Sequence, residues 1–173
     1  MSRKINIVLF EPEIADNVGA IFRTASLTNS VLHLIEPFGF IFDRRNFARS
    51  SANTFDGVPY FKYDNWDDFC EKNPKAVLYC LSRYGSKPIS DFDFTKINSE
   101  VFLLFGKEST GIPKSILQKN IQTVFRIPMV ATGRSLNIAN TVGISTYEVL
   151  RQWDYLDLSK VEVEKGADYL TKE

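Results

Sequence analysis

Three short loops that contain glycine and polar residues each follow a predicted buried strand. They run from Leu81 to Gly85, from Gly106 to Gly111 and from Pro128 to Ser135. In parallel α/β sheets ligands lie beyond the carboxyl ends of the strands, where free backbone groups and helix N-termini are available. We therefore expect the three loops to converge on one ligand.

A small set of polar side chains lies in or beside these loops and could act on that ligand. Glu108 belongs to the second loop, Asn137 follows the third, and Asn17 and Arg23 flank the start of the first predicted helix. An arginine near a helix start is not favoured by the helix dipole, so Arg23 is unusual for stability alone. Taken singly, each feature also has a structural interpretation, as a glycine turn, a helix cap or a surface arginine.

Several other kinds of site find no support in the sequence. The chain lacks the glycine pattern of dinucleotide-binding folds and the phosphate-binding loop of nucleotide hydrolases. Its only histidine, His33, lies within a predicted strand and is better explained as a packed or surface residue than as a catalytic one. Cys70 and Cys80 have no metal-binding or redox spacing, so we expect no metal and a reduced protein.

Composition favours one folded domain over residues 1–173, with a peripheral tail from about residue 154. The formal net charge is zero, which argues against non-specific coating of nucleic acid but allows a local basic patch. There is no signal-peptide pattern and no apolar stretch of the roughly 18 residues that a membrane span needs. We expect a cytoplasmic protein.

Apolar runs and turn residues predict alternating strands and helices. The predicted strands are 5–10, 31–35, 58–63, 76–81, 101–105 and 123–127, and the predicted helices are 19–28, 65–72, 113–119 and 135–153. This alternation indicates an α/β fold with a mostly parallel sheet and helices on both faces. The last helix has so broad an apolar arc that it should be buried on more than one side, and we expect its second side to meet a partner chain. Gly143 in its middle would allow a close helix crossing.

Three arginines, Arg44, Arg45 and Arg49, are interleaved with Phe42 and Phe47. Such a segment is most often a solvated face. The aromatic residues between the charges also suit contact with RNA bases and phosphates.

Three ordered motifs together resemble the SPOUT class of methyltransferases, in its branch that methylates ribose 2′-hydroxyls. They are Asn17-Val-Gly-Ala-Ile-Phe-Arg23, Leu104-Phe-Gly-Lys-Glu-Ser-Thr-Gly-Ile-Pro113, and the stretch from Ile127-Pro-Met to Arg134-Ser-Leu-Asn-Ile-Ala-Asn140. The runs 6–14 and 33–40 are similar to the TrmL-type (YibK-type) members, which methylate the wobble ribose of certain leucine tRNAs. The resemblance spans nearly everything from Ile5 to Gln152.

The resemblance implies a C-terminal trefoil knot that holds S-adenosylmethionine, with no metal. By matching position, the cofactor-binding residues would be Leu81, Gly106, Ile127, Met129, Ser135 and Leu136. It also implies a homodimer through the C-terminal helix, which would bring the partner's Arg23 near the cofactor.

The implied reaction is methyl transfer to the ribose of a wobble cytidine or uridine derivative in tRNA. Arg23 would assist removal of the hydroxyl proton, although a group with a pKa above about 12 is better suited to holding phosphate and stabilising the alkoxide. Asn17, Glu108 and Asn137 would contact the ribose or hold Arg23. The RNA-binding residues would be Arg44, Arg45, Arg49, Lys107 and Arg134. Two alternatives remain, a ribosomal RNA ribose methyltransferase and a knotted RNA-binding protein without catalysis.

Overall fold

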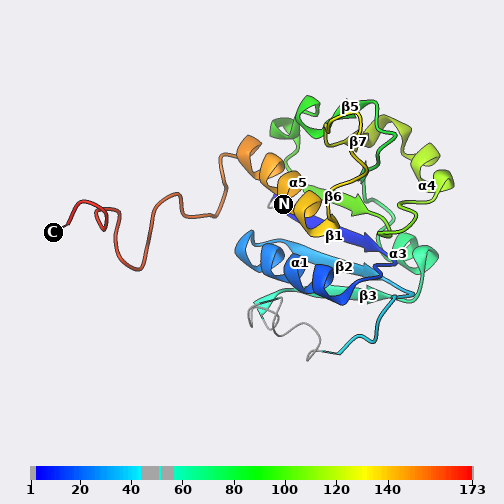
Figure 1. Ribbon diagram of the computed structural model, residues 1–173, viewed down its shortest axis with the longest axis horizontal. Helices are drawn as coiled ribbons and strands as arrows, with labels where there is room; N and C mark the ends of the chain where they lie inside the picture. The colour runs from blue at the N-terminus through cyan, green and yellow to red at the C-terminus, as the bar shows by residue number, and fades with distance from the viewer. Residues whose placement is uncertain (1–2, 44–50, 52–56, 173) are drawn as a thin grey trace.

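A computed structural model of the protein describes residues 3–43, 51 and 57–172. Within them, all strands pair in parallel and form one seven-stranded sheet in the order β3-β2-β1-β6-β4-β7-β5 (Figure 1). The strands are β1 (Lys4–Phe10), β2 (Val31–Ile35), β3 (Tyr60–Tyr63), β4 (Leu78–Leu81), β5 (Lys87–Pro88), β6 (Glu100–Phe105) and β7 (Val124–Arg126). The parallel sheet predicted from the sequence is therefore confirmed.

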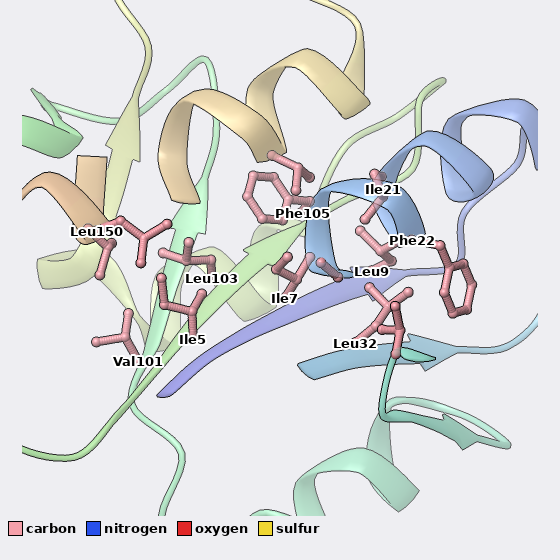
Figure 2. Packing of buried hydrophobic residues seen from close by; sticks show 14 of the residues in the cluster. Ile5, Ile7, Leu9, Ile21, Phe22, Leu32, Val101, Leu103, Phe105 and Leu150 are labelled. Carbon is pink, nitrogen blue, oxygen red and sulfur yellow. The ribbon is translucent and has the colours of Figure 1, made fainter. Parts of the chain in front are cut away.

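The central strands are apolar on both sides because helices cover both faces of the sheet. Along β1, Ile5, Ile7 and Leu9 belong to one buried cluster, whereas Val8 and Phe10 belong to another. The first cluster packs beneath helices α1 (Ala15–Leu27) and α5 (Ile138–Gln152), and Figure 2 shows its members from these helices and the central strands. The second packs beneath α3 (Trp66–Lys72) and α4 (Lys114–Lys119). Burial on both faces explains why β1 and β6 are continuous apolar runs.

Two helix starts differ from the predicted ones. α1 begins at Ala15, not Gly19, so Asn17 lies in its first turn and not in a loop. α5 begins at Ile138, not Ser135, because the Asn137 side chain accepts a hydrogen bond from the amide of Ala139 at 2.8 Å and caps the helix. The cap that Asn65 was predicted to provide for α3 is confirmed, since its side chain accepts from the Asp68 amide at 2.9 Å.

The strands at the two ends of the sheet show where the prediction was less complete. β3 begins at Tyr60, two residues later than predicted, and β5 was not predicted at all. β5 contains Pro88, which an edge strand tolerates because one side of it needs no hydrogen-bond donor. The segment 44–49 lies outside the described residues.

Trp153, Tyr155 and Leu158 still pack against the core after α5, and the chain beyond them extends away from the sheet (Figure 1). Several of its apolar side chains are exposed, among them Val161, Val163 and Leu170. The peripheral tail from about residue 154 stays a prediction. In the part of the chain that the structure describes, no helix combines the length and the apolar character that crossing a bilayer requires.

Candidate functional site

A cleft of about 750 Å³ opens at the carboxyl ends of β4, β6 and β7. The loops that follow these three strands form its walls, and Asn137 and Ile138 at the start of α5 close one side. Ile14 and Asn17 reach it from the start of α1. The three loops that the sequence marked as unusual thus converge on one space, as predicted.

Close backbone contacts explain two glycines of these loops. A Cβ on Gly106 would lie 2.2 Å from the carbonyl carbon of Gly111, so the loop can close on itself only with glycine at this position. The amide of Gly111 donates to the carbonyl of Lys107 at 2.9 Å and fixes the turn. A Cβ on Gly85 would lie 2.3 Å from the backbone carbon of Phe125, so the loop after β4 rests directly on β7.

A chain of side-chain hydrogen bonds joins the three motifs across the cleft. The Asn17 amide nitrogen donates to Glu108 Oε1 at 2.9 Å, and the Asn137 amide nitrogen donates to Asn17 Oδ1 at 2.8 Å. Asn137 also caps α5 with its own carbonyl oxygen. The three side chains, which we call the cleft triad, hold the starts of α1 and α5 and the loop after β6 in one arrangement.

Glu13 adds a second link between the segment that precedes α1 and the loop after β6. Its carboxylate accepts from the Ser109 amide and the Ser109 hydroxyl, both at 2.8 Å, and its own amide donates to Glu108 Oε2 at 2.9 Å. The bonds from Ser109 lower the pKa of the Glu13 carboxyl below its usual value, and the bond from the hydroxyl has the largest effect. Glu108 and Glu13 therefore each accept from the other's loop, and both loops are fixed together.

The structure brings most of the predicted site residues to this cleft. All six predicted cofactor-binding residues line it, namely Leu81, Gly106, Ile127, Met129, Ser135 and Leu136. Three of the four predicted catalytic residues line it as well, and they are the members of the cleft triad. Lys107 and Arg134, two of the predicted RNA-binding residues, lie at the same cleft.

Arg23 is not brought to the cleft of its own chain. It lies six residues after Asn17, about 9 Å further along α1, and its side chain is exposed. Among the described residues it makes no hydrogen bond or ion pair. Arg44, Arg45 and Arg49 lie outside the described residues. His33 is buried in β2 away from the cleft, in agreement with its interpretation as a packed strand residue.

Sequence reasoning missed several residues of the site. Arg83, Tyr84 and Arg126 line the cleft, and the side chain of Tyr84 is 80% exposed at its edge. Only Ser82 separates the dipeptide Arg83-Tyr84 from the end of β4, so its position after a buried strand was the signal that could have identified it. Lys107 was predicted to meet RNA, but its ammonium forms an ion pair with Glu11, which raises the pKa of Lys107.

The cleft combines apolar walls with exposed backbone groups and a positively charged edge. Leu81, Ile127 and Leu136 supply apolar surface for a flat ring, and the loop backbones supply donors and acceptors. Arg83, Lys107, Arg126 and Arg134 outnumber the one lining carboxylate, Glu108. Such a cleft suits an organic ligand with a ring, next to a polyanionic one.

Known proteins share both the sequence and the fold of this chain. A protein of Listeria monocytogenes that carries the name of a tRNA (cytidine(34)-2′-O)-methyltransferase is 43% identical over 150 residues, covering 87% of this chain and 89% of the relative. A solved structure concerned with 2′-hydroxyl methylation of C/U34 on tRNA is 31% identical, with a TM-score of 0.81, and covers 88% of this chain and 97% of that one.

An AdoMet-bound rRNA methyltransferase from Sinorhizobium meliloti shares the fold, with a TM-score of 0.76 and 23% identity over 86% of this chain and 56% of its own. The sequence pattern of the SpoU rRNA methylase family matches residues 4–147, which include all three motifs around the cleft. On that match and on the 43% identical relative, the chain belongs to the SpoU rRNA methylase family.

Proposed function

We propose that this protein transfers a methyl group from S-adenosylmethionine to the ribose 2′-hydroxyl of the wobble nucleotide of tRNA. The observation that carries the proposal is the cleft triad, which joins the three family motifs at one cleft. The names of the 43% identical relative and of the 31% identical structure direct the proposal to cytidine or uridine at position 34. Leucine tRNAs are the proposed substrates within that class, and the cytoplasm is the proposed compartment.

The residues of the cleft fit S-adenosylmethionine. The volume of the cleft, about 750 Å³, lies within the range of about 300–1,000 Å³ that small-molecule sites occupy. Leu81, Ile127 and Leu136 provide the apolar surfaces that an adenine ring needs, and the loops at Gly106 and Met129 provide backbone groups for its polar edge. When bound, this cofactor would supply an activated methyl group on a positively charged sulfur.

The residues of the chain would position the acceptor ribose and handle its proton. Transfer demands that the 2′-oxygen be held in line with the methyl group, which is mainly a matter of orientation. Asn17 and Asn137 present amide groups at the cleft, and Glu108 holds Asn17 in place through its Oε1. As the oxygen loses its proton, a nearby guanidinium would stabilise the negative charge that develops.

We propose that Arg23 of a second copy supplies that guanidinium. Arg23 is exposed on α1, which packs beside α5, and α5 carries the exposed apolar side chains Ile144 and Tyr147. Their exposed fractions of 46% and 49% give the outer face of α5 an apolar surface that a second copy could cover. A Cβ on Gly143 would meet nothing within 4 Å, so no contact among the described residues explains this glycine, and a crossing helix of the partner would.

The remaining parts of the proposal concern the RNA and the path of the chain. Arg134 and Arg83, both exposed at the edge of the cleft, would meet the phosphates of the anticodon loop, together with Arg44, Arg45 and Arg49. The C-terminal part of the chain would form the trefoil knot that the SPOUT resemblance implies. The chain would act as a single domain.

Methyl transfer by the purified protein tests the proposal directly. Transfer RNA made without modifications would be incubated with labelled S-adenosylmethionine and then digested, and each 2′-O-methylated nucleotide would be mapped by mass spectrometry. We expect one new methyl group, at nucleotide 34 of leucine tRNA. If ribosomal RNA fragments in a parallel incubation are methylated and tRNA is not, the ribosomal alternative is favoured. Binding of tRNA with no binding of S-adenosylmethionine would favour a non-catalytic RNA-binding protein.

A further inference from the structure

Arg126, the last residue of β7, differs from the other positive charges of the cleft in having a buried side-chain nitrogen without a partner among the described residues. Its side-chain Nε is buried and has no hydrogen-bond acceptor among the described residues. Lys107 is paired with Glu11, and the Arg83 guanidinium lies 5.7 Å from the ring centre of Tyr84. Arg134 is exposed to solvent.

The cleft offers Arg126 no carboxylate of its own. Glu108 is the one acidic residue that lines it, and its two carboxylate oxygens accept from the Glu13 amide and from Asn17, not from Arg126 Nε. Guanidinium stays charged under all physiological conditions, and buried polar groups are nearly always hydrogen-bonded. No described residue supplies the acceptor that Nε needs, and an anionic ligand in the cleft would supply it.

The backbone of Arg126 is held in place by its neighbours in the sheet. Arg126 pairs with Pro88 in the sheet, and a Cβ on Gly85 would lie 2.7 Å from the Arg126 amide nitrogen. The next residue, Ile127, also lines the cleft. A half-buried guanidinium that lines a cleft, with its Nε buried, is suited to a planar, bidentate anion.

We propose that Arg126 is the anion-binding residue of the cleft and takes a carboxylate or phosphate oxygen of a ligand. This inference rests on the proposed function, which supplies two ligands with such oxygens. S-adenosylmethionine carries one anionic group, the carboxylate of its amino-acid part, and tRNA carries phosphates. The shared chemistry is an anionic oxygen that accepts from the guanidinium.

Calorimetry with two cofactors that differ in one group distinguishes the sources. S-adenosylmethionine and decarboxylated S-adenosylmethionine would be titrated into the wild type, Arg126→Gln and Arg126→Lys. If the carboxylate is the ligand, Arg126→Gln weakens binding of S-adenosylmethionine about tenfold or more, while the decarboxylated form changes less than about twofold. Arg126→Lys keeps the positive charge but lacks the planar guanidinium that can donate two parallel hydrogen bonds. We therefore expect a smaller loss of affinity than for Arg126→Gln. Lys114→Met, which removes an exposed charge on α4 outside the cleft, is the control.

The second arm measures tRNA binding at several salt concentrations. If a phosphate is the ligand, Arg126→Gln leaves cofactor binding unchanged, weakens tRNA binding about tenfold and lowers the salt slope by about one. The inference is overturned if neither ligand binds more weakly, or if both cofactors weaken equally in a folded variant, which would indicate a purely structural role. A wild type that binds no S-adenosylmethionine counts against the proposed function, and the tRNA arm then decides the role of Arg126.

A labelling experiment on the wild type covers the case in which both variants fail to fold. Phenylglyoxal modifies arginine side chains, and the extent of modification at Arg126 can be followed by peptide mass spectrometry. Saturating S-adenosylmethionine or tRNA should protect Arg126 against the reagent. Equal modification with and without both ligands would refute the inference.

Discussion

The cleft triad and the cluster around His33 are built from similar polar side chains but lie in opposite surroundings. His33 Nδ1 lies 2.8 Å from the Tyr63 hydroxyl and Nε2 lies 2.9 Å from Asn6 Oδ1, and the rings of Phe61, Phe69 and Phe102 lie within 6 Å of its own. Burial lowers the pKa of His33 to about 4. The cleft triad has comparable hydrogen bonds but borders a cleft of about 750 Å³.

The difference shows how the same chemistry serves two purposes in one sheet. The His33 network makes its hydrogen bonds within the protein, although Asn6 Nδ2 has no partner among the described residues, so it contributes to the stability of one packing arrangement. A network at a cleft keeps some of its surface for a ligand, so its loss should affect turnover more than stability. The comparison predicts that substitutions at the two networks will have separable effects.

The largest effect should follow from Glu108→Ala, which removes the acceptor for both Asn17 and the Glu13 amide. Loss of a group that fixes catalytic geometry typically costs about 10²- to 10³-fold, so we expect kcat/KM for tRNA methylation to fall by that factor. Glu71→Ala, at an exposed position of α3, is the matched control. Equal activity of the variant and the wild type would show that the triad is structural.

Acid should weaken the fold through His33. Its pKa is lower in the folded protein than the ordinary value of 6.5, so the unfolded chain binds the extra proton first. The stability that neutral His33 contributes is fully present above pH 6.5 and is lost as the pH falls toward 4, by about 3 kcal/mol. Urea unfolding at several pH values, compared with His33→Leu, measures this difference. A variant with the same pH dependence as the wild type would exclude His33 as the cause.

A smaller effect on turnover is expected from Glu13→Gln. The amide side chain can still accept one hydrogen bond but no longer takes both from Ser109. Charged hydrogen bonds contribute about 1.5–3 kcal/mol, so partial loss should lower kcat/KM about tenfold. Glu100→Gln, exposed at the start of β6, should leave turnover unchanged. If both variants behave alike, Glu13 does not position the loop.

The smallest effect should come from Tyr63→Phe, which deletes the hydroxyl shared by His33 and Asn73. Removing a neutral hydrogen-bonding group costs about 1 kcal/mol of unfolding free energy. Because the cluster is enclosed, methylation by the folded variant should equal that of the wild type. A large loss of turnover without loss of stability would mean that the two networks are coupled.

Much of the sheet could be predicted because its central strands are buried on both faces. β1, β2 and β6 were placed within one residue, since continuous apolar runs between turn residues indicate parallel strands. β5 was not predicted because a strand of two residues at a sheet edge is too short to show an apolar pattern. The start of α1 was predicted too late because residues 14–19 were interpreted as a loop, and Ile14 provides no side-chain cap to mark the helix start.

The site was predicted from residue types more completely than from spatial relations. The residues of the three loops could be expected to meet, since strand ends share one edge of a parallel sheet. The partnership of Glu13 with Ser109 joins residues 96 positions apart, and no local pattern indicates it. The distance of Arg23 from its own cleft follows from the direction of α1, which only the packed structure provides.

The most direct test of the account is the methylation state of nucleotide 34 in cells that lack this protein. Leucine tRNAs would be isolated from the deletion strain and from strains complemented with the wild type or with Asn17→Ala, and their 2′-O-methyl groups would be mapped by mass spectrometry. We predict that the methyl group at nucleotide 34 is absent after deletion, restored by the wild type and not restored by Asn17→Ala. Undiminished 2′-O-methylation of nucleotide 34 in the deletion strain would contradict this function.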